Sequence, residues 1–562
     1  MNNDTIADNF SLLAKLMDIH GENPFKSKSY ANAAFQIDKL TAPLAGLSEH
    51  QIAGLKGIGE TIAQKIIEQL STGSLAILNE YLEKTPSGIL DMLRIKGIGP
   101  KKIATIWKEL EIESLGELLY ACNENRLTLY KGFGEKTQQN IKDAIEFYLK
   151  HQGLFLFAEL ENWVMQFEKQ LQIAFPEYLS KIVGDYVRQM EIIHQIQIIT
   201  TIPTEKITAF LTKLSFTILP SQSKNIILAN SADSIQVQLQ ITDTTQYYQV
   251  VFRNSASDEF ISYWEKLNGP IHSSDYQSEE HIFKKANIHY IPPAQRESIE
   301  IIDKAKVEPL TPVIQQHEIK GIIHSHSNWS DGMHTLEEMA IAAKQKKMEY
   351  LVISDHSRSA FYANGLHPDR ILAQHAAIEK LNKAFAPFTI FKSIESDILN
   401  EGALDYPEVV LNSFDLVIAS IHSNLKMQKE KAMARLLKAI ENPFTTILGH
   451  LTGRLLLSRA GYPIDHEIII DACVQHQVAI ELNAHPRRLD LDWRWIDKAI
   501  KKGALISINP DAHAIEGFAD IRYGIMVAQK AGLTATNNLS SFTLLQFQQF
   551  IDRQKQKRST TH

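Results

Sequence analysis

Short apolar runs that end in histidine or an acidic residue recur through the C-terminal half of the chain. From about Lys320 onward, runs such as KGIIHSH, YLVISDH, FDLVIASIH and VAIELNAH alternate with helical segments. This alternation predicts a parallel sheet whose crossover connections are helices. Because the carboxyl ends of parallel strands meet at one end of such a fold, we expect the polar residues there to converge on one pocket.

The residues at these strand ends have the chemistry of metal ligands. His324 and His326 stand two residues apart, so they share one face of an extended strand. A lone pair of this kind is equally typical of buried histidines that only satisfy hydrogen bonds. A succession of such strand ends instead favours a metal site. Nitrogen and oxygen ligands without thiolate suit Zn²⁺, Mn²⁺ or Fe²⁺.

The N-terminal 150 residues contain a repeat in which two glycines flank an apolar residue just before a helix. The copies are LKGIGETIAQKI, IKGIGPKKIATI and LYKGFGEKTQQNI. Such a turn leaves backbone N–H groups open at a helix N-terminus, where they can bind a phosphate without a side-chain cation. One copy would be read as a helix cap, whereas three favour binding to the DNA backbone. The glycines concerned are Gly57, Gly59, Gly97, Gly99, Gly132 and Gly134.

Composition, charge and the absence of certain motifs exclude several other classes of protein. The 562 residues are expected to form several domains, and two cysteines are too few for a disulfide framework or a thiolate zinc cluster. The net charge of −7 gives no broad cationic belt, so local geometry must carry any DNA binding. The Rossmann fingerprint is excluded because Ile62 and Lys102 stand where its third glycine would be. Without a signal peptide or a long apolar run, we expect a cytoplasmic, nucleoid-associated monomer with no membrane partner.

The repeats, together with DIHGENPFKSKSYANAA, resemble the N-terminal and fingers regions of family X DNA polymerases. The resemblance implies that the chain binds DNA at ends, gaps or abasic sites. Lys65 falls where some members carry the Schiff-base lysine of a deoxyribose-phosphate lyase. An exposed helical lysine is more often simply solvated, so the lyase activity stays open.

The polymerase centre of that family needs three carboxylates, which hold two magnesium ions. In the stretch VGDYVRQMEIIHQIQIIT, Gly184 of the nucleotide-binding turn remains, but Asp185 replaces the serine. Glutamine cannot neutralise two Mg²⁺ and a triphosphate, so the sequence predicts a degenerate polymerase site. The carboxylate positions are occupied by Gln195, Gln197 and Gln238.

The second half resembles a PHP (polymerase and histidinol phosphatase) domain. This resemblance implies a distorted (β/α)7 barrel with about three divalent metals, Zn, Mn or Fe, of which Mn²⁺ is expected to support activity. Glu395 and Asp511 are the predicted catalytic carboxylates, and Arg454 and Arg487 are candidates to clamp a phosphate. The ligand positions that carry over are His324, His326, Asp331, His356, Glu395, His422, His450, Asp511 and His513.

These observations predict a multidomain protein. Its function is predicted to be metal-dependent DNA phosphoester hydrolysis, as a 3'-to-5' exonuclease or 3'-end processing enzyme of DNA repair. Alternatives are a family X repair polymerase with PHP proofreading, a phosphatase of small molecules such as histidinol phosphate, and a non-catalytic DNA-end scaffold. The expected parts are an N-terminal helical DNA-binding domain (1–90), a fingers-like hairpin region (91–150), a degenerate α+β palm- and thumb-like nucleotidyltransferase region (151–290), a linker (291–319) and the PHP domain (320–562).

Overall fold

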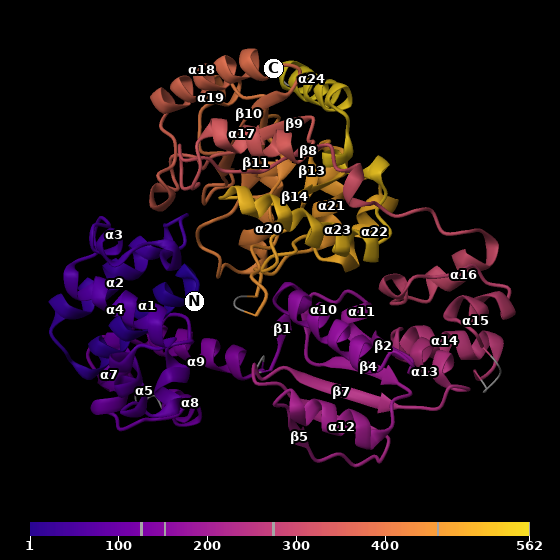
Figure 1. Cartoon of the computed structure of the whole chain (residues 1–562). Coiled ribbons are helices and arrows are strands. Elements are labelled where there is room, and N and C mark those ends of the chain that lie inside the picture. The colour runs from indigo at the N-terminus through magenta and orange to yellow at the C-terminus, as the bar shows by residue number, and fades with distance from the viewer. Residues whose placement is uncertain (124–126, 151–152, 272–275, 458–459, 561–562) are drawn as a thin grey trace. The chain divides into compact units, whose positions relative to one another are not determined.

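The computed structural model describes residues 1–123, 127–150, 153–271, 276–457 and 460–560 (Figure 1). The chain forms two compact units, Met1–Gln152 and Gly153–His562. No helix within these described ranges combines the length and the apolar character that crossing a membrane requires.

The first unit is helical. Its first helix begins where the Asn2 side chain accepts the Thr5 N–H, and it ends at Gly21 in the left-handed conformation. One apolar cluster, which includes Phe10, Leu13 and Ile106, joins the helices. Those helices are α1 (Asn3–His20), α2 (Pro24–Asp38), α3 (Glu49–Ala53), α4 (Glu60–Thr72), α5 (Ala76–Glu83), α6 (Ser87–Met92), α7 (Pro100–Lys108), α8 (Leu115–Asn123) and α9 (Glu135–Lys150), with 3₁₀ turns η1 (Leu44–Gly46) and η2 (Leu127–Leu129).

The region of the second unit that is expected to be palm-like contains a five-stranded sheet in the order β2-β4-β7-β6-β5, here called the palm-like sheet. Val237 and Leu239 are buried between half-exposed glutamines, which confirms the alternation predicted for SIQVQLQI. Helices α10 (Phe157–Ala174) and α12 (Thr204–Lys213) share an apolar core with this face of the sheet. The strands are β2 (Ser180–Val183), β4 (Ile196–Thr200), β5 (Thr217–Leu219), β6 (Ile226–Asn230) and β7 (Gln236–Ile241), and only the β4–β7 pair is parallel.

Short elements connect this sheet to the rest of the unit. They are β1 (Phe155–Leu156), α11 (Gly184–Val187), β3 (Ile192–Ile193), α13 (Tyr247–Asn254), α14 (Asp258–Asn268), α15 (Glu279–Lys285) and α16 (Glu300–Val307). The segment expected to be a linker contains α16, and its Arg296 is fully buried. The Arg296 guanidinium donates to Glu279 Oε1 at 2.6 Å and to the Ile291 carbonyl at 2.8 Å. This ion pair fixes the start of the segment against α15.

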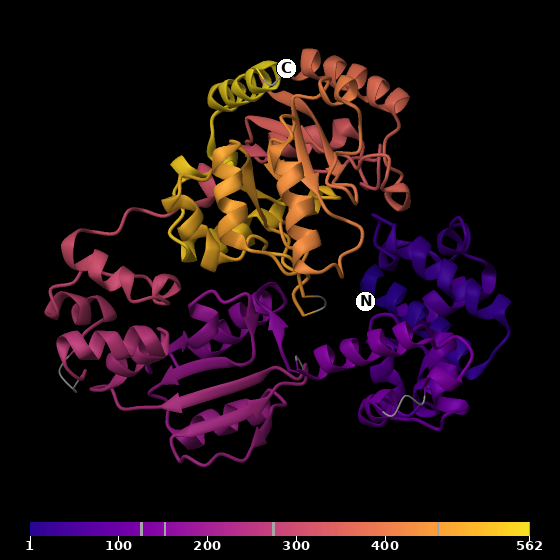
Figure 2. The same cartoon turned by 180° about the vertical axis from the view of Figure 1, so that it is seen from behind.

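The C-terminal part is a barrel of seven parallel strands in sequence order, as predicted. A parallel bridge between Ser325 and Ala512 joins the chain after the first strand to the chain after the last, which nearly closes the barrel. Helices surround the strands on the outside (Figures 1 and 2). The strands are β8 (Gly321–Ile322), β9 (Tyr350–Ile353), β10 (Thr389–Asp397), β11 (Leu416–Ser420), β12 (Ile447–Leu448), β13 (Ala479–Asn483) and β14 (Ile506–Asn509).

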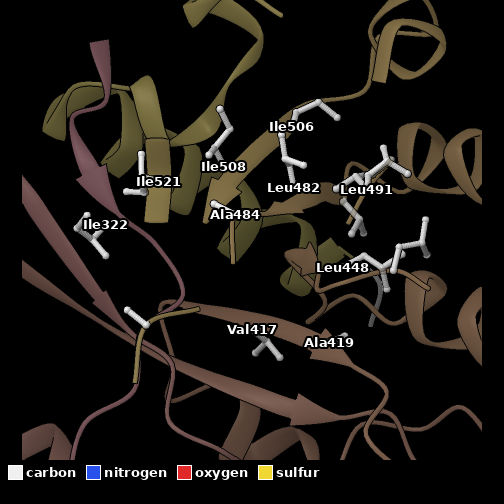
Figure 3. Packing of buried hydrophobic residues seen from close by; sticks show 14 of the residues in the cluster. Ile322, Val417, Ala419, Leu448, Leu482, Ala484, Leu491, Ile506, Ile508 and Ile521 are labelled. Atoms are coloured by element: carbon white, nitrogen blue, oxygen red, sulfur yellow. The ribbon is translucent and has the colours of Figure 1, made fainter. Parts of the chain in front are cut away.

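The barrel strands are apolar on both faces because both faces are covered. Val417 and Ala419 belong to the outer cluster beneath the helices, which Figure 3 shows together with Leu482 and Ile508. Leu416 and Ile418 point the other way, into a cluster closed by Phe547 of the last helix. The helices are α17 (Leu336–Gln345), α18 (Pro368–Phe385), α19 (Glu408–Leu411), α20 (Lys429–Glu441), α21 (His466–Gln475), α22 (Trp493–Lys501), α23 (Ile521–Lys530) and α24 (Leu544–Thr560).

Candidate functional site

The predicted ligands converge around the carboxylate of Glu395, near the end of β10. This side chain is 1% exposed. One carboxylate oxygen, Oε1, lies 2.9 Å from His450 Nε2, 3.2 Å from His422 Nε2 and 3.4 Å from His324 Nε2. The other, Oε2, lies 2.9 Å from His356 Nδ1 and 3.7 Å from His326 Nε2. The histidines come from loops that follow β8, β9, β11 and β12, so the barrel brings together residues far apart in sequence.

Asp511 and His513 close the same cluster from the loop after β14. Asp511 Oδ1 lies 3.1 Å from His326 Nε2 and 3.3 Å from His324 Nε2. Asp331 Oδ2 lies 3.4 Å from His513 Nε2 and 3.5 Å from His356 Nε2.

Three overlapping groups of these side chains could each hold a cation, because their ligand atoms all lie within 4.8 Å of one another. His450 is in none of these groups, although it contacts Glu395. The groups are His326, Asp331, His356 and His513; His324, His326 and Asp511; and His356, Glu395 and His422.

The hydrogen bonding of the cluster fits bound cations. Buried polar atoms are normally paired, because an unpaired one costs free energy. Among the described residues, His324 Nε2, His326 Nδ1, Glu395 Oε2 and His450 Nδ1 are buried with no hydrogen-bond partner. Cations are the partners that imidazole nitrogens and a carboxylate oxygen would both accept.

The electrostatics keep the carboxylates ionised. Burial would raise the pKa of Glu395, but His422, His324 and His356 outweigh it and hold the pKa well below its usual range. Burial likewise opposes ionisation of Asp331, yet hydrogen bonding to His513 and the nearby imidazoles lower its pKa to about 2. These side chains are therefore negatively charged at neutral pH, as cation ligands must be.

Three of the predicted ligands have unusual backbone conformations. The φ angles of His324, His450 and Asp511 are +63°, +21° and +51°. These values lie in or near the left-handed region, which residues other than glycine rarely adopt. Such strain persists only where surrounding contacts impose it, and it is concentrated at functional sites. Here the turns after β8, β12 and β14 direct side chains toward Glu395.

Two carboxylates that were not predicted from the sequence orient the predicted ligands. Glu481, fully buried in β13, accepts from His324 Nδ1 at 2.6 Å and from the His450 backbone N–H at 2.7 Å. Asp397, two residues after Glu395, lies 2.5 Å from His422 Nδ1. A carboxylate on one ring nitrogen fixes which nitrogen faces a metal. A lone acidic residue inside an apolar strand, as in VAIELNAH, was the available signal.

Replacement of Glu481 by glutamine is expected to weaken Mn²⁺ binding by roughly 10- to 100-fold, because His324 loses the anion that orients it. Isothermal titration of the full-length variant with Mn²⁺ measures this loss. The matched control is Glu379→Gln, which removes an exposed carboxylate paired with Lys392. Equal Mn²⁺ affinity in the two variants would contradict the orienting role.

The arginines near the site differ in their contacts. Arg454 donates to Asp492 Oδ2 at 2.6 Å, to the Arg488 carbonyl at 2.9 Å and to the Leu489 carbonyl. Its guanidinium is thus engaged by neighbouring loops, and Arg487 pairs with Glu159 at 3.2 Å. Arg488, which the sequence analysis did not select, is nearest the cluster, with Nε 3.7 Å from Asp511 Oδ2.

The palm-like sheet brings the three glutamines together. Gln197 and Gln238 are register partners on β4 and β7, and Gln195 Nε2 donates to Gln238 Oε1 at 3.2 Å. A Cβ placed on Gly184 would meet Gln197 Oε1 at 1.9 Å, so this amide packs directly against the turn. Asp185 forms an ion pair with Arg188 at 2.5 Å. Among the described residues, the groups able to hold a metal all lie at the barrel cluster.

The glycine pairs of the first unit stand immediately before α4, α7 and α9. Gly57, Gly97 and Gly132 have φ of +80°, +92° and +92°, which explains the first glycine of each pair. The second glycine precedes the helix, and Gly59 and Gly99 leave α4 and α7 without a side-chain cap.

Among the residues of the first unit that the structure describes, neither strain nor crowding explains the second glycine of each pair. Gly59 and Gly99 have φ of −78° and −84°, which any residue adopts. A Cβ at Gly59, Gly99 or Gly134 would meet no atom within 4 Å. Free space above uncapped N–H groups is what the close approach of a phosphate requires. Lys65, on α4, forms an ion pair with Glu68 at 2.6 Å.

Known families match both the N-terminal helical unit and the barrel, and one known protein matches nearly the whole chain. Residues 1–75 match the helix-hairpin-helix domain family, 89–146 the SAM-like helix-hairpin-helix tandem and 323–485 the PHP domain. The chain is 30% identical over 565 residues to the DNA polymerase/3'-5' exonuclease PolX of Bacillus subtilis, covering 96% of this chain and 98% of that protein. It is also 26% identical over 229 residues to a probable phosphatase of Thermoanaerobacter sp., covering 38% of this chain and 89% of that protein.

Proposed function

Because the chain belongs to the bacterial family X DNA polymerases that carry a C-terminal PHP domain, we propose that it is a metal-dependent DNA phosphoesterase that processes 3' ends in DNA repair. The observation that carries this proposal is the convergence of the histidines and carboxylates on Glu395. The relative from Bacillus subtilis is named a 3'-5' exonuclease, which supports the same direction of action.

The proposed ligands are the nine residues predicted from sequence, and the proposed cofactors are about three ions of Zn, Mn or Fe. Such ions, when bound, supply positive charge that stabilises a phosphoryl transition state and acidifies water. Glu395 and Asp511 keep the imidazoles in one cluster, while Glu481 and Asp397 orient His324 and His422. Arg488 is the proposed phosphate contact, in place of Arg454, because each of the three guanidinium nitrogens of Arg454 already donates a hydrogen bond.

The helix-hairpin-helix regions support DNA binding, which we assign to the three glycine pairs. We further propose that the palm-like region does not polymerise DNA. Gln195, Gln197 and Gln238 are neutral at the positions where carboxylates must hold Mg²⁺. Asp185, an acidic residue, also stands at the turn where phosphates would bind.

A small-molecule phosphatase is the second candidate, because the barrel resembles probable phosphatases over most of their length. One experiment separates the candidates. Full-length protein with Mn²⁺ receives 3'-labelled and 5'-labelled duplexes, with and without dNTPs, and separately histidinol phosphate. Laddering from the 3' end without extension is expected. Primer extension would contradict the degenerate palm. Phosphate release from histidinol phosphate with intact DNA would select the phosphatase.

A further inference from the structure

Two loop segments, 449–457 after β12 and 484–492 after β13, are joined by hydrogen bonds beside the candidate metal centre. Thr452 donates to Asp490 Oδ2 through both its backbone N–H and its hydroxyl, at 2.8 Å each. The Leu456 N–H donates to the Arg487 carbonyl at 2.6 Å. Together with the contacts of Arg454 described above, these hydrogen bonds couple the two loops, so a displacement of one loop is expected to displace the other.

This pair of loops carries groups of the proposed phosphoesterase site. His450 lies at the start of the first loop, 2.9 Å from Glu395, and Arg488 lies in the second, 3.7 Å from Asp511. A shift of the pair would displace both groups. Displacements of about 1 Å are enough to slow a positioned reaction roughly 100-fold.

One acidic residue of the palm-like region lies beside both the first of these loops and the start of α22, which follows the second loop. Glu191, just before β3, is 6% exposed. Its carboxylate lies 3.9 Å from Arg454 Nη2 and 3.8 Å from Arg494 Nη1. Both arginines also pair with Asp492, at 2.6 Å and 3.0 Å. Glu191 and Asp492 thus share the two arginines, and the loss of the buried Glu191 charge would remove one of the anions that hold them.

We infer that the palm-like region braces the phosphoesterase site, with Glu191 as the positioning residue that fixes the joined loops through Arg454 and Arg494. This inference rests on the proposed function, since the loops matter only if the barrel hydrolyses phosphoesters. It gives the palm-like region a role that needs no carboxylates on β4 and β7. Glu191 acts on the reaction through the two arginines and does not itself contact the cluster residues.

The chain offers a matched control in Glu161. This carboxylate also lies in the palm-like region and contacts the barrel, 2.9 Å from Arg522 Nη2 and 3.2 Å from the Tyr523 hydroxyl. Those partners belong to α23, which carries none of the predicted site residues. A Glu161 variant therefore measures the effect of weakening the contact between the palm-like region and the barrel in general. A Glu191 variant measures the specific effect on the two joined loops.

The test compares full-length Glu191→Gln and Glu161→Gln by hydrogen exchange without metal and by Mn²⁺-dependent hydrolysis of bis-p-nitrophenyl phosphate. For Glu191→Gln we expect exchange in 484–492 to accelerate about tenfold, as local opening becomes easier. We also expect kcat to fall about tenfold with KM nearly unchanged, because positioning acts on the chemical step. Glu191→Asp, which retains the charge, should restore most of the loss.

Equal exchange of 484–492 in wild type and Glu191→Gln would overturn the inference, and so would an identical effect of Glu161→Gln. Hydrogen exchange needs no turnover. It therefore tests whether Glu191 fixes the two loops even if the enzyme hydrolyses none of the phosphoesters tried. Inactivity of the wild-type protein toward both bis-p-nitrophenyl phosphate and DNA 3' ends would instead reject the proposed function.

Discussion

A Glu395→Gln substitution is expected to lower the rate of the proposed Mn²⁺-dependent processing of DNA 3' ends by roughly 100-fold or more. This loss exceeds that expected for removal of an orienting contact. The substitution keeps the volume of the side chain and removes only its charge. Five histidines lie within 4 Å of this carboxylate, on both of its oxygens. A neutral amide can neither hold cations there nor balance the imidazoles.

Measurements of metal content and of folding distinguish a loss of bound ions from a loss of the folded barrel. Burial opposes protonation of His422, but Glu395 and the hydrogen bond to Asp397 raise its pKa to about 10. Without the Glu395 charge, that pKa should fall. Elemental analysis of the purified variant should show fewer bound ions, and circular dichroism should show a folded barrel. Glu379→Gln is the control, and retention of wild-type rate by Glu395→Gln would refute the central role of this carboxylate.

The barrel could be predicted from the sequence because its strands are apolar on both faces and regularly spaced. The runs that contain Val352, Ile418 and Ile480 are short and separated by helices, which specifies parallel pairing. Residues at the end of each run then had to meet, whatever the details of the loops. Topology places His450 and Asp511 at the same end of the barrel as Glu395, and the turns after β12 and β14 then direct their side chains toward it.

Contacts between distant loops could not be predicted in the same way. Arg454 and Arg487 are the phosphate contacts predicted from the sequence because both follow barrel strands, a position that Arg488 shares. The structure separates them because Asp492 and two carbonyls engage Arg454, whereas Arg488 Nε lies near Asp511. The contacts of Glu191 are harder to predict, because its partners Arg454 and Arg494 lie more than 250 residues away along the sequence. No local pattern encodes such a pair.

The second glycines of the hairpins are expected to be required for DNA binding and not for folding. A Gly59→Ala, Gly99→Ala double variant would place two methyl groups over uncapped helix N-termini. Charge-assisted hydrogen bonds contribute about 1.5–3 kcal/mol each, so the loss of a phosphate contact should weaken binding roughly 10- to 100-fold. The φ angles suit alanine, so the melting temperature should stay constant or rise slightly.

Fluorescence anisotropy with a gapped duplex measures this affinity, and a circular dichroism melt checks the fold. Gly46→Ala is the matched control, because a Cβ there also meets no atom within 4 Å, but Gly46 ends the 3₁₀ turn η1 and belongs to no hairpin. If the double variant and Gly46→Ala bound DNA equally well, the hairpins would be helix caps alone. Because the net charge is −7, DNA binding would then need a cationic surface that the composition does not suggest.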